Sequence, residues 1–405
     1  MGRTRTARTL GPACTVLAVL LSVLPAAAQE ENGVKMGSGR LHPSLEVEGH
    51  YDSLALIAEQ GSAGDLILHF RPGLKLDLPS PAFAVQLNGQ ADYNLYTGII
   101  NPSSRRLSYL GGDALLDVNI NQDGPVGVRL GDRFQFSDRI SAIGLGAGVR
   151  SAFNEAYGSI PIRPGGGALV FEPGYAFAFE AFFALLAQPA GVNPQSLNYI
   201  SHRPSLLAKW HFLPKTAVVL DVRSDLRIYG RNQGNPGVNA LYAQTGLSGL
   251  ITPKLSLSLL AGYGNAFVDP TSGVANYESV IGQADLGWFV TESGKLKIGY
   301  LRTFQPVPQF GWYGNNRVYV GSSFQFAGRL TWALDGSLDF VDYATGRSDF
   351  LARIDTSFDF RVTGWLHLAV GYRFNLRIAG EAAGATDPGF DYNRHEGWGR
   401  LVLVY

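Results

Sequence analysis

Residues 366–378, LHLAVGYRFNLRI, alternate apolar with polar or small side chains over their whole length. Leucine, valine and aromatic side chains occupy one parity, and His367, Arg373, Asn375 and Arg377 occupy the other. Successive side chains of a β-strand point to opposite faces of the sheet. This stretch is therefore predicted to form a strand with one apolar face and one polar face.

The same alternation recurs along the chain. The segment before the turn at 363–364 sets Phe350, Ile354 and Phe358 against Arg353 and Asp355. Further strands of this kind are expected at residues 41–54, 66–78 and 83–95. A soluble sheet can alternate in this way, but long strands repeated over a whole chain favour a barrel with lipid outside and water inside.

The connections between the predicted strands alternate in length. Short links are expected at 79–81, 122–125, 213–216, 252–254, 291–295, 327–328 and 363–364, and longer ones at 96–106, 230–239, 264–276, 305–316, 343–348 and 379–394. Short turns at one end and long loops at the other are typical of bacterial outer-membrane barrels, whereas soluble sandwiches do not alternate in this way. The prediction is an all-β fold, a transmembrane antiparallel up-and-down barrel of about 18 strands, with 16 as the alternative.

One stretch, 138–188, is harder to interpret. It is rich in glycine and proline, and its apolar run is interrupted at Pro173 and Gly174. We predict a long external loop at 139–167, a short strand near 168–172 and a second strand at 175–186. The loop could fold into the barrel as a constriction or cap the outside, and the sequence leaves both possibilities open.

The N-terminus has the features of a secretory signal. Arg3, Arg5 and Arg8 precede an apolar run at 15–24, and a small-residue cleavage site follows at 26–28. We expect a signal peptide at 1–28 and the barrel at 29–405. The alternative, an uncleaved membrane anchor, is disfavoured because the run is shorter than the ~20 residues that span a bilayer.

Composition excludes several classes of protein. Cys14 is the only cysteine, so the mature protein is expected to contain no disulfide and no thiolate metal site. Lys plus Arg and Asp plus Glu both number 33, so a nucleic-acid partner is not expected. The 50 glycines and 12% aromatic residues suit a β protein with many turns.

Aromatic residues gather near both ends of the predicted strands. Trp210, Phe212, Trp288, Phe289 and Trp365 lie near short turns, and Tyr96, Tyr229, Tyr263, Phe304, Trp312 and Tyr343 lie near long loops. Two such groups are expected to form the aromatic girdles of the two membrane interfaces.

The last strand, GWGRLVLVY at 397–405, resembles the C-terminal signal of outer-membrane β-barrels from diderm bacteria. It has an aromatic last residue, Tyr405, and apolar residues at alternate positions before it, Leu401 and Leu403. Phenylalanine is the usual last residue, so Tyr405 departs slightly from the pattern. The resemblance implies an outer-membrane location, a lipid bilayer as partner, and insertion by the barrel-assembly machinery. Within that class the chain is similar to porins and porin-like channels.

Charged residues of the inward parity are the candidate functional residues. The predicted pore-lining set is Arg223, Arg227, Arg353, Asp355, Arg361, Arg373 and Arg377. In a barrel of ~16–18 strands, wide enough for an aqueous channel, such residues would screen solutes. The expected function is passive diffusion of small hydrophilic solutes or ions. The alternative interpretation of the same residues is a dry interior filled with salt bridges.

Three other functions are alternatives. A barrel blocked by the loop at 139–167 would be a surface-exposed structural or adhesive protein. Transport of an apolar ligand would need an apolar lumen or an opening in the wall, for which Val170 and Phe182 leave some room. An enzyme would need a paired histidine, and only His395 and Asp391 lie close together. No catalytic residue, metal ligand or cofactor is predicted.

Overall fold

The structure, a computed structural model, describes residues 33–58, 61–138, 149–184, 194–230, 237–307, 311–380 and 391–405. The predicted signal peptide, residues 1–28, lies outside these ranges. Residues Gly33–Tyr405 form one compact unit. No helix in the described part of the chain is long and apolar enough to cross a membrane.

The unit is built almost entirely from β-strands. The strands are β1 (Val34–Met36), β2 (Gly39–Ala58), β3 (Gly61–Leu78), β4 (Phe83–Tyr96), β5 (Tyr109–Ile120), β6 (Val128–Asp138), β7 (Val149–Ser159), β8 (Leu169–Ala184), β9 (Tyr199–Leu213), β10 (Thr216–Tyr229), β11 (Val238–Thr252), β12 (Leu255–Val268), β13 (Tyr277–Thr291), β14 (Gly294–Val307), β15 (Gly311–Phe326), β16 (Leu330–Tyr343), β17 (Ser348–Arg361), β18 (Leu366–Ala379) and β19 (Tyr392–Val404). Short 3₁₀ helices lie in four connections: η1 (Pro102–Leu107), η2 (Pro164–Gly166), η3 (Pro194–Leu197) and η4 (Pro270–Ser272).

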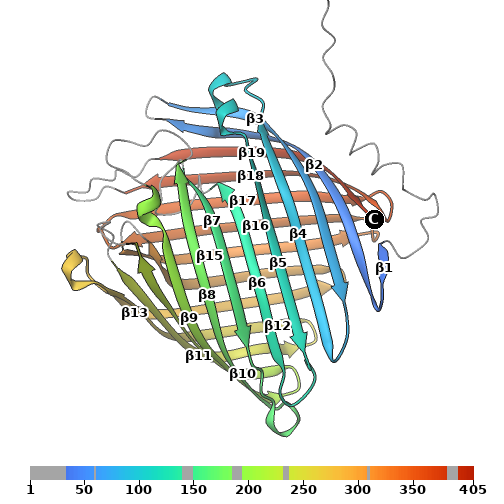
Figure 1. The fold of residues 1–405 in the computed structure, drawn as a ribbon, viewed down its shortest axis with the longest axis vertical. Coiled ribbons are helices and arrows are strands. Elements are labelled where there is room, and N and C mark those ends of the chain that lie inside the picture. The colour runs from blue at the N-terminus through green and yellow to red at the C-terminus, as the bar shows by residue number, and fades with distance from the viewer. Residues whose placement is uncertain are drawn as a thin grey trace, which may run out of the picture. The chain divides into compact units, whose positions relative to one another are not determined.

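Strands β2 to β19 form a closed ring of 18 antiparallel strands. Each strand pairs with the next along the chain, and β19 pairs with β2 from Glu396↔Asp52 to Val404↔Ser44. The short β1 folds back on the start of β2 and does not add to the wall. In Figure 1 the blue-to-green strands of the front wall cross the orange-to-red strands of the rear wall, because strands in a closed barrel are tilted. The predicted fold and strand number are confirmed.

The two faces of the wall differ as the alternation predicts. Large apolar side chains such as Val370, Ile354 and Ile298 are at least half exposed on the outer face. Polar and charged side chains such as Asp52 and Glu48 are buried on the inner face. Because an apolar belt in water would be costly, this arrangement suits a barrel whose outer surface contacts lipid.

The prediction for 138–188 was wrong in its details. Residues 149–159, assigned to the long loop 139–167, form wall strand β7, and the rest of that loop up to 148 lies outside the described residues. The two strands predicted at 168–172 and 175–186 are one strand, β8, which pairs with β7 and β9 through Pro173 and Gly174. Those two residues suggested a break, but the ladders continue past them. One strand, β7, was missed and another, β8, was predicted as two strands, so the predicted total of 18 is still correct.

The aromatic residues of the two predicted girdles differ in exposure. Trp210, Trp288 and Trp365 are 54%, 49% and 42% exposed near the short turns, as expected for one interface. At the other end Phe304 and Tyr343 are buried, so they do not belong to an outer girdle. Tyr96, also buried, lies three residues after the outward Tyr93 and therefore has the opposite parity.

A buried carboxylate holds the connection between β4 and β5. Asp65, at the start of β3, accepts hydrogen bonds from the backbone N–H of Gly98 (2.8 Å) and Ile100 (3.3 Å). It also accepts one from the hydroxyl of Ser104 in η1. The Asp65 side chain is fully buried. One residue of the wall thus anchors several residues of the loop.

Candidate functional site

The structure places the predicted site residues on the inner face of three strands. Arg223 and Arg227 belong to β10, whereas Arg353, Asp355 and Arg361 belong to β17 and Arg373 and Arg377 to β18. The opposite parity of these strands carries the exposed apolar side chains. The set is not one site, because six strands, β11 to β16, separate β10 from β17 in the ring.

On β17 and β18 the arginines differ in exposure. Asp355 accepts from Arg373 Nε at 2.6 Å and pairs with Arg353 at 3.2 Å. The Arg353 side chain remains 52% exposed, whereas Arg377, 2.6 Å from buried Asp349, is 11% exposed. The Arg353 side chain is therefore accessible from the barrel interior, whereas Arg377 is part of a packed ion pair.

Arg361 lies apart from this group. It is the last residue of β17, at the end of the strand that leads into the short turn, and it is exposed. Its backbone N–H donates to the carbonyl of Arg329 in the neighbouring turn. Its charge therefore lies at the barrel end near the short turns.

The two arginines of β10 also divide into a packed and an exposed one. Arg227 pairs with Asp225 at 2.9 Å, lies 4.5 Å from the ring centre of Tyr199, and donates to the carbonyl of Pro306 on β14. Arg223 is exposed and lies 4.9 Å from the ring centre of Tyr242. Arg227 thus joins distant parts of the wall across the interior, whereas the charge of Arg223 faces water.

A further charged region of the inner wall includes Arg353. A cavity of about 390 Å³ there is lined by Lys297, Arg317, Tyr319, Asp335 and Arg353, among others. All three cations have acidic partners: Lys297 lies 3.1 Å from Asp285, Arg317 lies 2.5 Å from Asp339, and Arg353 pairs with Asp355. Sequence reasoning did not single out Lys297 or Arg317, although their inward parity could have indicated them.

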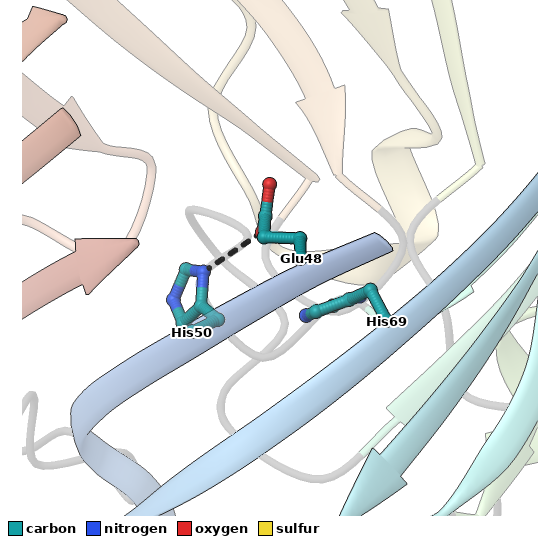
Figure 2. Close-up of side chains that lie close together, drawn as sticks. All are labelled: Glu48, His50 and His69. Atoms are coloured by element: carbon teal, nitrogen blue, oxygen red, sulfur yellow. Dashed lines mark hydrogen bonds and ion pairs between the residues drawn. The ribbon is translucent and has the colours of Figure 1, made fainter. Parts of the chain in front are cut away.

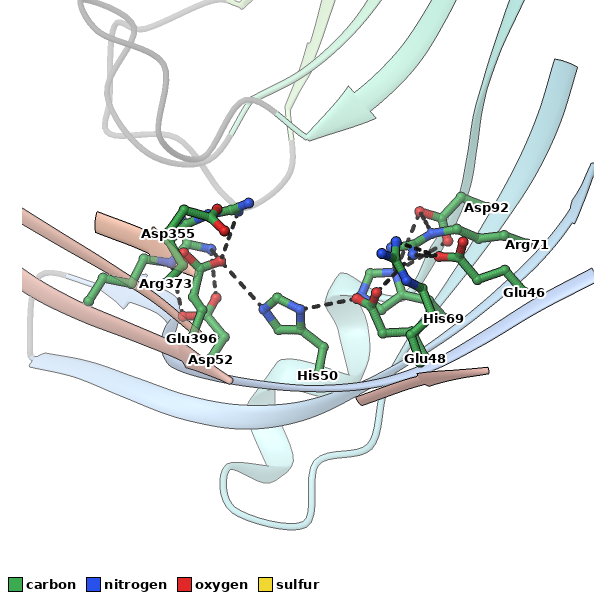
Figure 3. Close-up of polar contacts among 12 residues, drawn as sticks. Glu46, Glu48, His50, Asp52, His69, Arg71, Asp92, Asp355, Arg373 and Glu396 are labelled. Carbon is green, nitrogen blue, oxygen red and sulfur yellow. Dashed lines mark hydrogen bonds and ion pairs between the residues drawn. The ribbon is translucent and has the colours of Figure 1, made fainter. Parts of the chain in front are cut away.

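A large charge network lies where the ring closes, across β2, β3, β4 and β19. Figure 3 shows His50 between two groups of charges, with Glu396 on one side and Glu48 on the other. Arg71 pairs with Glu46, with Glu48 (3.2 Å) and with Asp92 (3.0 Å). Arg394 holds buried Asp52 at 2.8 Å. The residues of β2, β3 and β4 lie in strands predicted from the sequence, whereas Arg394 belongs to β19 and not to the loop predicted at 379–394. The convergence of the network was not predicted, because it depends on the register between β19 and β2.

Three residues of this network could hold a metal ion. One ligand atom each from Glu48, His50 and His69 lies within 4.8 Å of the others, and Figure 2 shows the two imidazoles on neighbouring strands. The same atoms already have partners, since His50 Nδ1 lies 3.3 Å from Glu48 and His69 Nδ1 lies 2.9 Å from Arg71. A cation would have to displace the guanidinium of Arg71. The donor set therefore fits an ion-pair network better than a metal centre.

One hairpin end of the described wall leans into the barrel interior; residues 139–148 of the loop that could form a constriction lie outside the described residues. The ends of β14 and β15, residues 303–307 and 311–315, lean inward over β11–β13; we call them the hairpin tip. Phe304 is fully buried there, stacked 4.5 Å from both Tyr242 and Tyr277, and Tyr242 Oη donates to its carbonyl. A Cβ on Gly264 would lie 2.7 Å from the Phe304 ring, so glycine is needed for this packing. The sequence had suggested a loop at 305–316, but most of it is strand.

The residues named for the enzyme and for the apolar-ligand transporter do not form the arrangements that those functions would need. His395 lies on β19, not in a loop, and its ring contacts Tyr372 Oη at 2.7 Å on the outer face. Asp391 instead accepts from the backbone N–H of Ala379. Phe182 is packed with Leu197 and Tyr199. The His–Asp pair is therefore not formed, and Phe182 does not supply an apolar lining.

Comparison with solved structures identifies the class of fold. The chain superposes on OccAB3 of Acinetobacter baumannii with a TM-score of 0.50, at 9% identity over 91% of this chain and 100% of that one. It superposes on OccK9 (OpdG) of Pseudomonas aeruginosa with a TM-score of 0.50, at 12% identity over 90% and 98%. Both are outer-membrane porins, and the chain has their fold, a closed 18-stranded barrel. Neither a protein-family profile nor a curated protein sequence matches the chain.

Proposed function

We propose that the protein is an outer-membrane channel through which small hydrophilic solutes or ions diffuse passively. The observation that carries this proposal is the pairing of an 18-stranded closed ring with exposed charges on its inner face. A ring of about 16–18 strands leaves room for an aqueous path, whereas about 8 strands are filled by side chains. The protein would thus replace a hydrocarbon barrier with a hydrated path and perform no covalent chemistry.

The exposed cations are proposed to set the ion selectivity of the aqueous channel. Arg223, Arg353 and the partly exposed Arg373 face the interior, while Arg361 lies at the end near the short turns. Asp355 partly neutralises the charges of Arg353 and Arg373. Rings and ladders of charge select ions in other pores, so a modest anion preference is expected. Arg227 and Arg377 are proposed to act indirectly, by bracing the wall.

The test is single-channel recording from refolded protein, residues 29–405, in a planar bilayer under a salt gradient. Stable conductance steps with a reversal potential of the anion-selective sign support the proposal. A folded barrel without conductance contradicts it. Folding is checked beforehand by the shift in gel migration between heated and unheated samples.

A second candidate function is favoured by one observation. The hairpin tip lies inside the barrel and is fixed there by the buried ring of Phe304 and by the bond from Arg227 to Pro306. A barrel closed at this level would be a surface-exposed structural or adhesive protein. Absence of conductance in the wild type together with conductance in a variant lacking the Phe304 ring would favour this function.

We also propose how the chain reaches the membrane. Residues 1–28 would direct secretion and be removed, and strand β19 with Tyr405 would be recognised by the barrel-assembly machinery. In support, β19 alternates apolar residues up to Tyr405, whose backbone N–H donates to Pro43 and so joins the ring closure. Deleting Tyr405 should lower the amount of protein in outer-membrane fractions; unchanged insertion would contradict the proposal.

A further inference from the structure

The wall of the barrel has a seam between β13 and β14. The ladder between these strands runs from Thr291↔Gly294 to Gly282↔Arg302 and ends there. Strand β13 nevertheless begins at Tyr277, and β14 continues to Val307 while still paired with β15. The edge of β13 from Tyr277 to Ile281 therefore has no ladder partner on β14, because the hairpin tip has left the wall.

Arg302 bridges the seam at the point where the β13–β14 ladder ends. Its Nε donates to the carbonyl of Val280 at 3.0 Å, and its terminal nitrogens donate to Ser279 Oγ (2.9 Å) and Asn316 Oδ1 (3.0 Å). A carbonyl that would otherwise face β14 is thus satisfied by a side chain. The bridge fixes the width of the seam without closing it.

Between Arg302 and the start of β13 at Tyr277, the seam holds a cavity of about 280 Å³. It is lined by Asn276, Tyr277, Glu278, Ser279, Arg302, Trp312, Gly314, Asn315, Asn316 and Asp342. Trp312 and Tyr277 meet edge to face, with ring centres 5.0 Å apart, and Trp312 Nε1 is held by the carbonyl of Ala275 at 2.7 Å. The volume is at the lower limit of about 300 Å³ for small-molecule pockets, which suits one ring-sized group.

One polar atom in the cavity lining lacks a partner. Asn315 is 6% exposed, and its Nδ2 donates to Asp339 Oδ1 at 2.8 Å. Its Oδ1 is buried and has no hydrogen-bond partner among the described residues. A buried acceptor without a donor costs free energy, about 1–3 kcal/mol in general. Because this oxygen is inaccessible to solvent, it is a feature of the packing beside the cavity and does not itself contact a ligand.

The chemistry of the lining indicates the class of ligand. Glu278 and Asp342 accept hydrogen bonds, Arg302 donates them, and the amides of Asn276 and Asn316 can do both. An inorganic ion of either sign would meet a like charge in this set. Hydroxyl groups donate and accept, and the rings of Trp312 and Tyr277 offer flat apolar surfaces to a C–H face. We propose that the seam binds a saccharide ring, supplied by a free sugar or by the headgroup of a glycolipid.

Hydrogen exchange of the β13 edge tests this proposal. The amides of Glu278 and Val280 face the seam, because the Val280 carbonyl accepts from Arg302, and they should exchange quickly when the seam is empty and slowly when it is occupied. One arm adds methyl β-glucoside, methyl β-galactoside or N-acetylglucosamine to the full barrel in detergent. The other compares lipid nanodiscs with and without monogalactosyl diacylglycerol. Trp312→Leu and Glu278→Gln remove parts of the lining. Trp332→Leu is the matched control, since Trp332 is held by Thr356 on the outer face of β16.

Slowed exchange with a soluble glycoside identifies a free sugar, and slowing only in glycolipid discs identifies a headgroup. In either case Trp312→Leu or Glu278→Gln should weaken the apparent affinity at least about tenfold, and Trp332→Leu should not. The proposal is overturned if neither arm slows exchange up to about 10 mM probe. Slowing that is unchanged in both seam variants also overturns it. These outcomes are independent of conductance.

Discussion

The ring of Phe304 on β14 lies 4.5 Å from the ring of Tyr242 on β11, with an angle of 16° between their planes. Strands β12 and β13 separate β11 from β14 in the sheet, so this stacking requires β14 to leave the wall. By parity Phe304 continues the outward face of Ile298 and Tyr300. Because the hairpin tip leans inward, that outward face packs against the inner surface of the neighbouring strands.

Replacing Phe304 by alanine should release the hairpin tip and increase single-channel conductance. Loss of the buried ring should also lower the free energy of unfolding by about 3–5 kcal/mol. Phe358→Ala is the control, because that ring is 44% exposed on the outer face. Equal conductance in wild type and Phe304→Ala would show that the tip does not narrow the path.

Reversing the charge of Arg353 should move the reversal potential toward cation selectivity. The side chain is 52% exposed on the inner face, and Arg353→Glu would place a second carboxylate beside Asp355. Lys254→Glu, in the turn between β11 and β12, makes the same charge change away from the inner wall. If both variants shift the reversal potential equally, Arg353 does not set the ion selectivity of the channel.

Removing Arg394 should destabilise the closure of the ring. Asp52 is 2% exposed and would lose its partner at 2.8 Å, which generally costs about 3–5 kcal/mol for a buried pair. Arg129→Ala breaks a pair with Glu172 at 3.7 Å in which Arg129 is 52% exposed, and should cost at most about 1 kcal/mol. Urea unfolding in detergent measures both. Similar losses would mean that burial of Asp52 does not decide the effect.

Asp65→Ala should loosen the connection between β4 and β5 while leaving the barrel folded. The carboxylate accepts from Gly98 and Ile100, and the exposed Arg105 and Arg106 in η1 offer trypsin sites. Cleavage there should become faster. Asp269→Ala, which removes an exposed cap from η4, should leave cleavage at η1 unchanged. Unchanged cleavage in Asp65→Ala would show that the loop is held by other contacts.

The sequence was sufficient for the architecture because alternation and turn spacing are local signals. The parity of Arg353 and Arg373, for example, follows from the residues on either side of them. The closure network could not be predicted, since Glu396 and His50 are brought together only by the register of β19 on β2. The hairpin tip was missed for a related reason. Its inward lean depends on where the β13–β14 ladder ends, and no local pattern encodes that point.

The closure of the ring by β2 and β19 also bears on how the protein tolerates cleavage. In an open sheet, a cut loop leaves two pieces that share one ladder. In this ring any single cut between β2 and β19 leaves two arcs that share two ladders, one at the cut hairpin and one at the closure. A nicked barrel should therefore remain assembled until it is denatured. The same topology makes the chain suitable for reconstitution from two separately expressed fragments.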